Sequence, residues 1–109
     1  MIAWQRSIRI LGYDYGLLTD RTLDDLCGAM GTCDSNKLII RVANDIPEQQ
    51  KQSTMLHEII EAIDYCLELG LEHRSINSLE AALYQVLCAN GVDLRPLLGN
   101  SAGQKVDKS

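Results

Sequence analysis

The segment from Pro47 to Gly70 constrains the fold most, because a helical hydrophobic period runs through it without interruption. At about 100° per residue, its apolar side chains fall on one half of a helix and its polar side chains on the other. Proline suits a first helical turn and glycine suits a helix end. The segment therefore predicts an amphipathic helix that ends near Leu69. Its apolar half is formed by Met55, Leu56, Ile59, Ile60, Ile63, Cys66 and Leu67.

Two segments before this helix have the composition of β-strands. Ser7–Leu18 is rich in β-branched and aromatic residues, and Gly12 inside it indicates a bulge or a close backbone approach. Lys37–Ala43 is the clearest strand, because alternate residues place Leu38, Ile40 and Val42 on one face. The residues between Gly31 and Lys37 are typical of a turn.

Two further helices are predicted. The first begins at Thr19 or Asp20 as N-cap and ends at Gly31, and its apolar face is Leu23, Leu26, Cys27 and Met30. The second covers Ser78–Asn90, with an inward face of Leu79, Ala82, Leu83, Val86 and Leu87. Gly91–Leu98 is expected to pack back onto the body. The fold class is therefore α+β, a single domain over residues 1–98 followed by a disordered tail over residues 99–109.

Composition excludes several classes of function. The chain has 109 residues and a formal net charge of −5, without the clustered Lys and Arg that nucleic-acid binding requires. It contains no apolar run near the roughly 18 residues of a membrane span, and its start lacks the apolar centre of a signal peptide. We expect a cytoplasmic protein that binds neither nucleic acid nor membrane.

The four cysteines form no CxxC pair, which is evidence against a zinc ribbon or a thioredoxin-type motif. Cys27, Cys66 and Cys88 fall among apolar residues at helical spacing and are interpreted as core residues. Cys33 is expected in a turn, where it could be exposed.

The sequence His57-Glu58-Ile59-Ile60-Glu61 differs by one residue from HExxH, the signature of zinc peptidases. Residues four apart lie one above the other on a helix, so His57 and Glu61 could share a cation. Zinc accepts both imidazole nitrogen and carboxylate oxygen. Glu58 lies about 100° around the helix, beside the metal, where it could take a proton from metal-bound water. A solvated polar stripe would show the same spacing.

A third ligand has to come from outside this motif. His73 follows the helix and could be a ligand or an exposed loop histidine. Glu80 stands three residues after Asn77, so it could be a ligand or part of a capping box. Asp64 could support a ligand or be exposed. Three ligands leave zinc an open position, whereas binding by His57, Glu61, His73 and Glu80 together would close it.

The order of elements, with "TMLHE" on a helix, resembles the minimal zincin core of ImmA/IrrE-like and SprT-like metallopeptidases. It is especially similar to short phage and prophage proteins in which a "LHEIIEA" helix precedes "LEH" and "LE…LYQVL". The resemblance covers about Ile8 to Gly91. It implies a short β-sheet packed on a central helix with two further helices, Zn²⁺ as cofactor, and a peptide or protein as substrate or partner.

The resemblance also implies roles for individual residues. His57 and Glu61 would be ligands, Glu58 the general base, and His73 the third ligand. Lys37–Ala43 would be the sheet edge to which an extended peptide adds.

Glu61 in place of histidine lowers the positive charge at the metal. A less positive metal lowers the pKa of a bound water molecule by a smaller amount. Two functions therefore remain open. The first is a zinc-dependent peptidase that uses metal-activated water. The second is an inactive zincin-like domain that binds a protein partner, with its metal structural or absent. A metal-free α+β domain is a third possibility.

Overall fold

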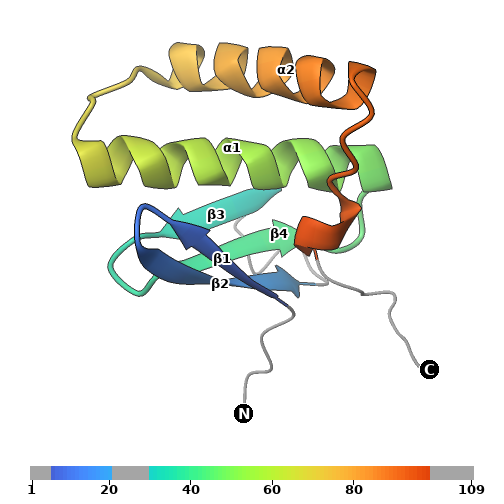
Figure 1. Cartoon of the computed structure of the whole chain (residues 1–109). Helices are drawn as coiled ribbons and strands as arrows, with labels where there is room; N and C mark the ends of the chain where they lie inside the picture. The colour runs from blue at the N-terminus through green and yellow to red at the C-terminus, as the bar shows by residue number, and fades with distance from the viewer. Residues whose placement is uncertain (1–5, 21–29, 99–109) are drawn as a thin grey trace.

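The computed structural model describes residues 6–20 and 30–98, and it confirms the α+β class. A four-stranded sheet lies under α1, and α2 lies on the other side of α1, which makes three layers (Figure 1). The elements are β1 (Arg6–Ile10), β2 (Tyr13–Asp20), β3 (Gly31–Asp34), β4 (Ile39–Ala43), α1 (Glu48–Leu67), α2 (His73–Ala89) and the 3₁₀ turn η1 (Arg95–Leu98).

The strand predicted over Ser7–Leu18 is a hairpin in the structure. Leu11 and Gly12 both have positive φ, 51° and 89°, and they form the turn between β1 and β2. Such a pair of left-handed residues gives a tight turn whose twist matches that of the strands. Gly12 therefore reverses the chain. The expected bulge is wrong, and so is the expected close backbone approach, because a Cβ at Gly12 would have nothing within 4 Å.

The sheet has the order β1-β2-β4-β3, with β2 and β4 parallel and the two outer pairs antiparallel. In β4, Ile40 and Val42 are fully buried, as the alternation predicts. β4 is an inner strand, however, so the expectation that Lys37–Ala43 forms the edge is wrong. The edge next to β4 is β3, the last strand in the order, and its residues 32–34 pair with β4 and are not part of the turn.

The turn between β3 and β4 is shorter than the sequence predicts. Asp34 Oδ1 accepts hydrogen bonds from the backbone N–H groups of Asn36 and Lys37, at 3.1 and 3.2 Å. This is the local bonding by which aspartate stabilises turns. Leu38 then takes a φ of 57° before β4 begins.

The helix predicted after Thr19 is partly contradicted. Thr19 and Asp20 belong to β2, so neither is the N-cap of a helix. At the other end, the Met30 carbonyl accepts a hydrogen bond from the Ala43 N–H of β4 at 2.7 Å. The rest of that prediction, with Leu23, Leu26 and Cys27, lies outside the described residues. The predicted tail over 99–109 lies outside them as well.

Helix α1 agrees closely with its prediction. It follows Pro47 and ends before Glu68, whose φ of 53° starts the chain reversal together with Gly70. Its apolar half is divided between two neighbours: Met55 is fully buried against the sheet, and Leu56 and Ile60 pack against α2, whereas Leu67 is exposed. The main core comprises Ile8, Ile10, Tyr15, Leu17, Ile40, Val42, Met55, Ala62, Leu94 and Leu98. Leu94 and Leu98 belong to Gly91–Leu98, so the prediction that this segment packs back is confirmed.

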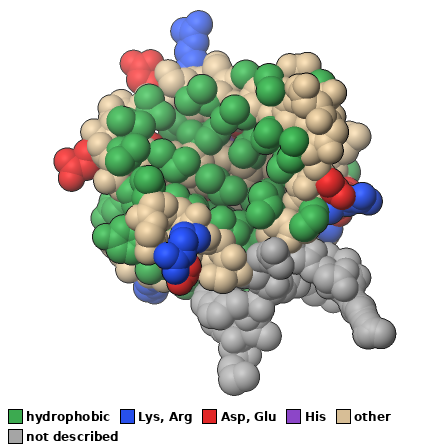
Figure 2. All heavy atoms as spheres, viewed as in Figure 1, with side chains coloured by type: hydrophobic (Ala, Val, Ile, Leu, Met, Phe, Trp, Pro, Cys, Tyr) green, Lys and Arg blue, Asp and Glu red, His purple; other side chains and the backbone are tan. Residues whose placement is uncertain are grey.

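Helix α2 begins at His73, five residues before the predicted start, and it is less buried than expected. Leu79, Leu83 and Val86 are 40–48% exposed, and Ala82 is exposed too. The predicted inward face is therefore wrong for these four residues. Among the described elements, α2 packs mainly against α1, and the side chains that this packing covers include Ile76 and Leu87. Figure 2 shows hydrophobic side chains over much of the face of the molecule that is seen in Figure 1.

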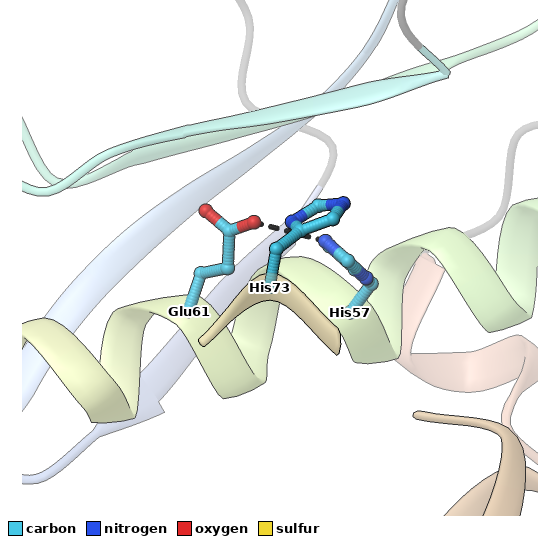
Figure 3. Close-up of side chains that lie close together, drawn as sticks. All are labelled: His57, Glu61 and His73. Atoms are coloured by element: carbon cyan, nitrogen blue, oxygen red, sulfur yellow. Dashed lines mark hydrogen bonds and ion pairs between the residues drawn. The ribbon is translucent and has the colours of Figure 1, made fainter. Parts of the chain in front are cut away.

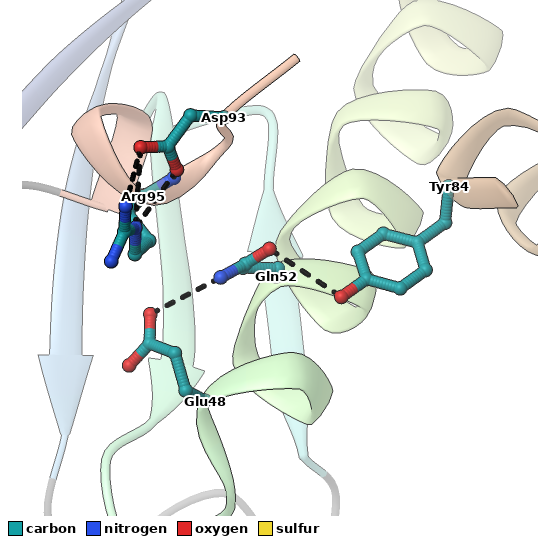
Figure 4. Close-up of polar contacts among 5 residues, drawn as sticks. All are labelled: Glu48, Gln52, Tyr84, Asp93 and Arg95. Carbon is teal, nitrogen blue, oxygen red and sulfur yellow. Dashed lines mark hydrogen bonds and ion pairs between the residues drawn. The ribbon is translucent and has the colours of Figure 1, made fainter. Parts of the chain in front are cut away.

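A buried amide links the two helices near the start of α1. The Tyr84 hydroxyl of α2 donates to Gln52 Oε1 at 3.4 Å, and Gln52 Nε2 donates to Glu48 Oε2 at 3.5 Å (Figure 4). Beside them, Asp93 Oδ1 accepts the backbone N–H of Arg95 at 3.0 Å, which fixes the start of η1.

Two of the cysteine predictions are also corrected. Cys88 is exposed and is not a core residue, and Cys33 lies half-buried on β3 against the core. Cys66 is half-buried, and Cys27 lies outside the described residues. Within residues 6–20 and 30–98, no helix is long and apolar enough to cross a membrane.

Candidate metal centre

His57, Glu61 and His73 come together between α1 and the start of α2. One ligand atom from each residue lies within 4.8 Å of the other two. Figure 3 shows the two imidazoles and the carboxylate pointing toward one another. His57 and Glu61 are one helical turn apart on α1, which is the geometry expected from their spacing.

The connection between the helices brings His73 to this place. The chain reverses at Glu68 and Gly70, and the Leu71 N–H then donates to Asp64 Oδ1 at 2.9 Å. Asp64 thereby fixes the loop two residues before His73. The ring centroids of His57 and His73 are 5.5 Å apart, at an interplanar angle of 67°.

The His57 ring is held from both sides. Its Nε2 lies 2.9 Å from Glu61 Oε2 and its Nδ1 lies 2.8 Å from Glu80 Oε1. The other oxygen of Glu80 accepts a hydrogen bond from Ser53. Burial lowers the pKa of His57, but the hydrogen bond to Glu80 and the nearby Glu58 and Glu61 charges outweigh it, so the pKa is raised.

Glu80 reaches His57 from the third turn of α2, because that helix starts at His73. The predicted capping box is therefore wrong: Asn77 lies inside the helix, and the N-cap residue is Glu72, which makes no side-chain capping bond. His73 is exposed, as one of its two interpretations expected, but it is the first residue of a helix and not a loop residue.

Glu58 is 5% exposed and lies in the same cavity as the three converging residues. Burial raises its pKa to about 7, the charge of Glu61 adds to the increase, and His57 opposes it. A carboxyl group with this pKa can both accept and donate a proton near neutral pH.

Gly31 allows β3 to approach α1 above Glu58, a function that the sequence did not reveal. A Cβ at this position would lie 2.5 Å from Thr54 Cγ2 and 3.1 Å from Glu58 Oε2. Sequence reasoning assigned Gly31 to the end of a helix. Its packing role depends on a contact between segments far apart in the chain, and no local pattern encodes that contact.

A cavity of about 490 Å³ contains the whole arrangement, including His57, Glu58, Glu61, His73 and Glu80. Residues of β3 form its other wall, and among them Cys33 was not predicted as part of the site. Burial raises the pKa of the Cys33 thiol to about 11, so the thiol is protonated at neutral pH.

The composition of the cavity favours a cation. Three carboxyl groups, from Glu58, Glu61 and Glu80, lie beside two imidazoles, and no lysine or arginine is among the described residues that line the cavity. Two imidazole nitrogens and one carboxylate oxygen form a donor set found at catalytic zinc sites. The side chains present therefore fit a zinc ion.

Comparison of the chain with protein-family models, with curated proteins and with solved structures finds no match. The zincin resemblance and the phage origin that it implies remain predictions.

Proposed function

We propose that His57, Glu61 and His73 bind a divalent transition-metal ion, and that this ion is Zn²⁺. The observation that carries the proposal is the convergence of their three ligand atoms within 4.8 Å. Atoms this close can share one ion after small side-chain movements, because two ligand atoms that zinc binds at about 2.0–2.2 Å lie at most about 4.4 Å apart.

Glu80 acts in this proposal as a positioning residue and not as a fourth ligand. It contacts Nδ1 of His57, whereas Nε2 faces Glu61. A carboxylate that accepts the Nδ1–H fixes the tautomer in which Nε2 has its lone pair free for a metal. Three protein ligands then leave the ion an open position, as catalytic sites require.

We further propose that the site hydrolyses peptide bonds. A bound zinc ion with an open position polarises a carbonyl group and acidifies water. Glu58 accepts the proton of the attacking water and delivers it to the leaving nitrogen as the C–N bond breaks. Its burial and its place next to His57 support this role.

The edge strand β3 supports a peptide as substrate. The Met30 carbonyl accepts a hydrogen bond from the Ala43 N–H of β4. Along an antiparallel pair, the main-chain N–H and C=O groups of successive residues point alternately toward the partner strand and away from it. Those of Gly31 and Cys33 therefore point away from β4. An extended peptide could pair with these groups beside the cavity. The proposal places the protein in the cytoplasm, where Cys33 stays reduced.

The test is cleavage of a proteome-derived peptide library by the zinc-loaded protein, read by mass spectrometry. We expect wild type to cleave, and Glu58→Gln to lose at least about 100-fold in rate while it retains zinc. Glu72→Gln, an exposed carboxylate outside the cavity, serves as the matched control and should cleave like wild type. A wild type that holds zinc and cleaves nothing in the library would refute the peptidase proposal and leave a metal-stabilised binding module.

A further inference from the structure

The cavity of the metal centre continues along α1 into two more cavities. The second, about 470 Å³, shares Cys33 and Glu61 with the first. The third, about 590 Å³, shares Ser35, Asp64 and Tyr65 with the second. The three cavities therefore lie next to one another between α1 and the sheet, and we call this row, from His57 at one end to Glu68 at the other, the groove.

The groove is acidic throughout. Among the described residues, no lysine or arginine lines any of its three parts. Six carboxyl groups line it: Asp34, Glu58, Glu61, Asp64, Glu68 and Glu80. A ligand that carries positive charge is therefore complementary to the groove as a whole.

The end far from the metal centre combines aromatic rings with a carboxylate. Tyr13 and Tyr65 are 54% and 58% exposed, so their rings are accessible to a ligand. The Tyr65 hydroxyl donates to Asn36 Oδ1 at 3.1 Å, which fixes that ring. Tyr15, fully buried, forms the floor. Exposed Glu68 lies in the same cavity. Aromatic faces beside a carboxylate suit an ammonium or guanidinium group.

We propose that the groove binds an extended peptide whose lysine or arginine side chain occupies the cavity formed by Tyr13, Tyr65 and Glu68. This inference rests on the proposed function, because it names the class of substrate that the metal centre would cleave. The metal centre holds the peptide bond, and the acidic aromatic cavity selects the side chain.

Helix geometry gives the spacing between the two ends. Glu61 and Glu68 are separated by about 10 Å along α1, at 1.5 Å per residue. An extended peptide advances about 3.3 Å per residue, so the basic residue lies about three residues from the cleaved bond. β3 runs from the metal centre toward the far cavity. A peptide antiparallel to β3 therefore places its basic residue on the amino-terminal side of that bond.

The experiment selects binders from a randomised eight-residue peptide library on immobilised, zinc-loaded protein carrying Glu58→Gln, which should bind peptides without cleaving them. We expect lysine or arginine to be enriched at one position. Replacing that lysine by norleucine should weaken binding about three- to tenfold, the effect of one cation–aromatic contact and one exposed ion pair. Adding Glu68→Gln or Tyr65→Leu should remove the enrichment.

Asp45→Asn is the matched control, because Asp45 is an exposed carboxylate that lines none of the three cavities, and it should leave the enrichment intact. Selected peptides without a basic preference would overturn the inference. So would a basic preference that survives both Glu68→Gln and Tyr65→Leu, and so would the absence of any enriched peptide. Zinc content is measured separately, so a protein that selects basic peptides without holding zinc would refute the metal-centre proposal alone.

Discussion

Replacing Glu58 by glutamine should stabilise the metal-free protein at alkaline pH. Glu58 is buried, and its pKa is raised from the ordinary 4.5 to about 7. An acid whose pKa is higher in the folded than in the unfolded state contributes stability that is complete below the unfolded pKa and disappears as pH rises through the folded pKa. The wild type should therefore lose stability between about pH 4.5 and 7.

The magnitude follows from the two pKa values. At roughly 1.4 kcal/mol per pH unit, the interval from 4.5 to about 7 corresponds to about 3 kcal/mol in the free energy of unfolding. Glutamine has the shape of the protonated acid and carries no charge. Glu58→Gln should thus match wild type near pH 5 to within about 1 kcal/mol and exceed it by about 3 kcal/mol near pH 8.

Urea denaturation in the presence of EDTA, at about pH 5 and about pH 8, measures both differences. His57 also has a raised pKa, and its contribution to stability falls in the same direction as pH rises. Because the Glu58 charge is one cause of that raised pKa, the difference between wild type and variant measures Glu58 together with its interaction with His57. Equal stability of the two proteins near pH 8 would refute the view that Glu58 is held buried at an energetic cost.

Three other predictions test the packing and the site. Gly31→Ala should destabilise the fold by about 1–3 kcal/mol through the contact with Thr54 Cγ2, and Thr54→Ser in the same chain should recover part of the loss in thermal unfolding. Ile40→Ala, at a fully buried site, should cost about 2–5 kcal/mol, whereas Leu83→Ala on exposed α2 should cost less than about 1 kcal/mol by urea denaturation. Glu80→Gln should weaken zinc affinity about 10- to 100-fold in a chelator competition, and unchanged affinity would contradict its positioning role.

Local pattern predicted the elements whose burial has a regular period. Strand β4 was recognisable because its alternate residues are buried, and helix α1 because its apolar residues recur at the helical period. β3 was not, because Thr32, Cys33 and Asp34 have turn-like composition and become a strand through pairing with β4. The hairpin turn at Leu11 and Gly12 also lacked the usual Asn-Gly or Asp-Gly pair.

The α2 face was mispredicted because burial depends on how layers stack. An apolar stripe such as Leu79 and Leu83 looks the same in sequence whether it meets a core or the surface, and in the described part of the structure α2 packs mainly on α1. The start of α2 was mispredicted because its N-cap residue, Glu72, makes no side-chain capping bond, so no capping motif in the sequence marks this helix end.

The site likewise combines contacts that local spacing predicts with contacts that depend on packing. The placement of His57 beside Glu61 follows from their spacing on one helix. The contact between Glu80 and His57 depends on where α2 begins and how it packs, and spacing along the chain contains neither fact.

The metal content of the purified, untagged protein, determined by elemental mass spectrometry, tests the central claim most directly. We predict near-stoichiometric zinc or another divalent transition metal in wild type and in Gln50→Ala, an exposed α1 control, and its loss in both His57→Ala and His73→Ala. A wild type that contains no metal and takes up no added zinc would contradict the metal centre. Metal content unchanged by both histidine variants would contradict it equally.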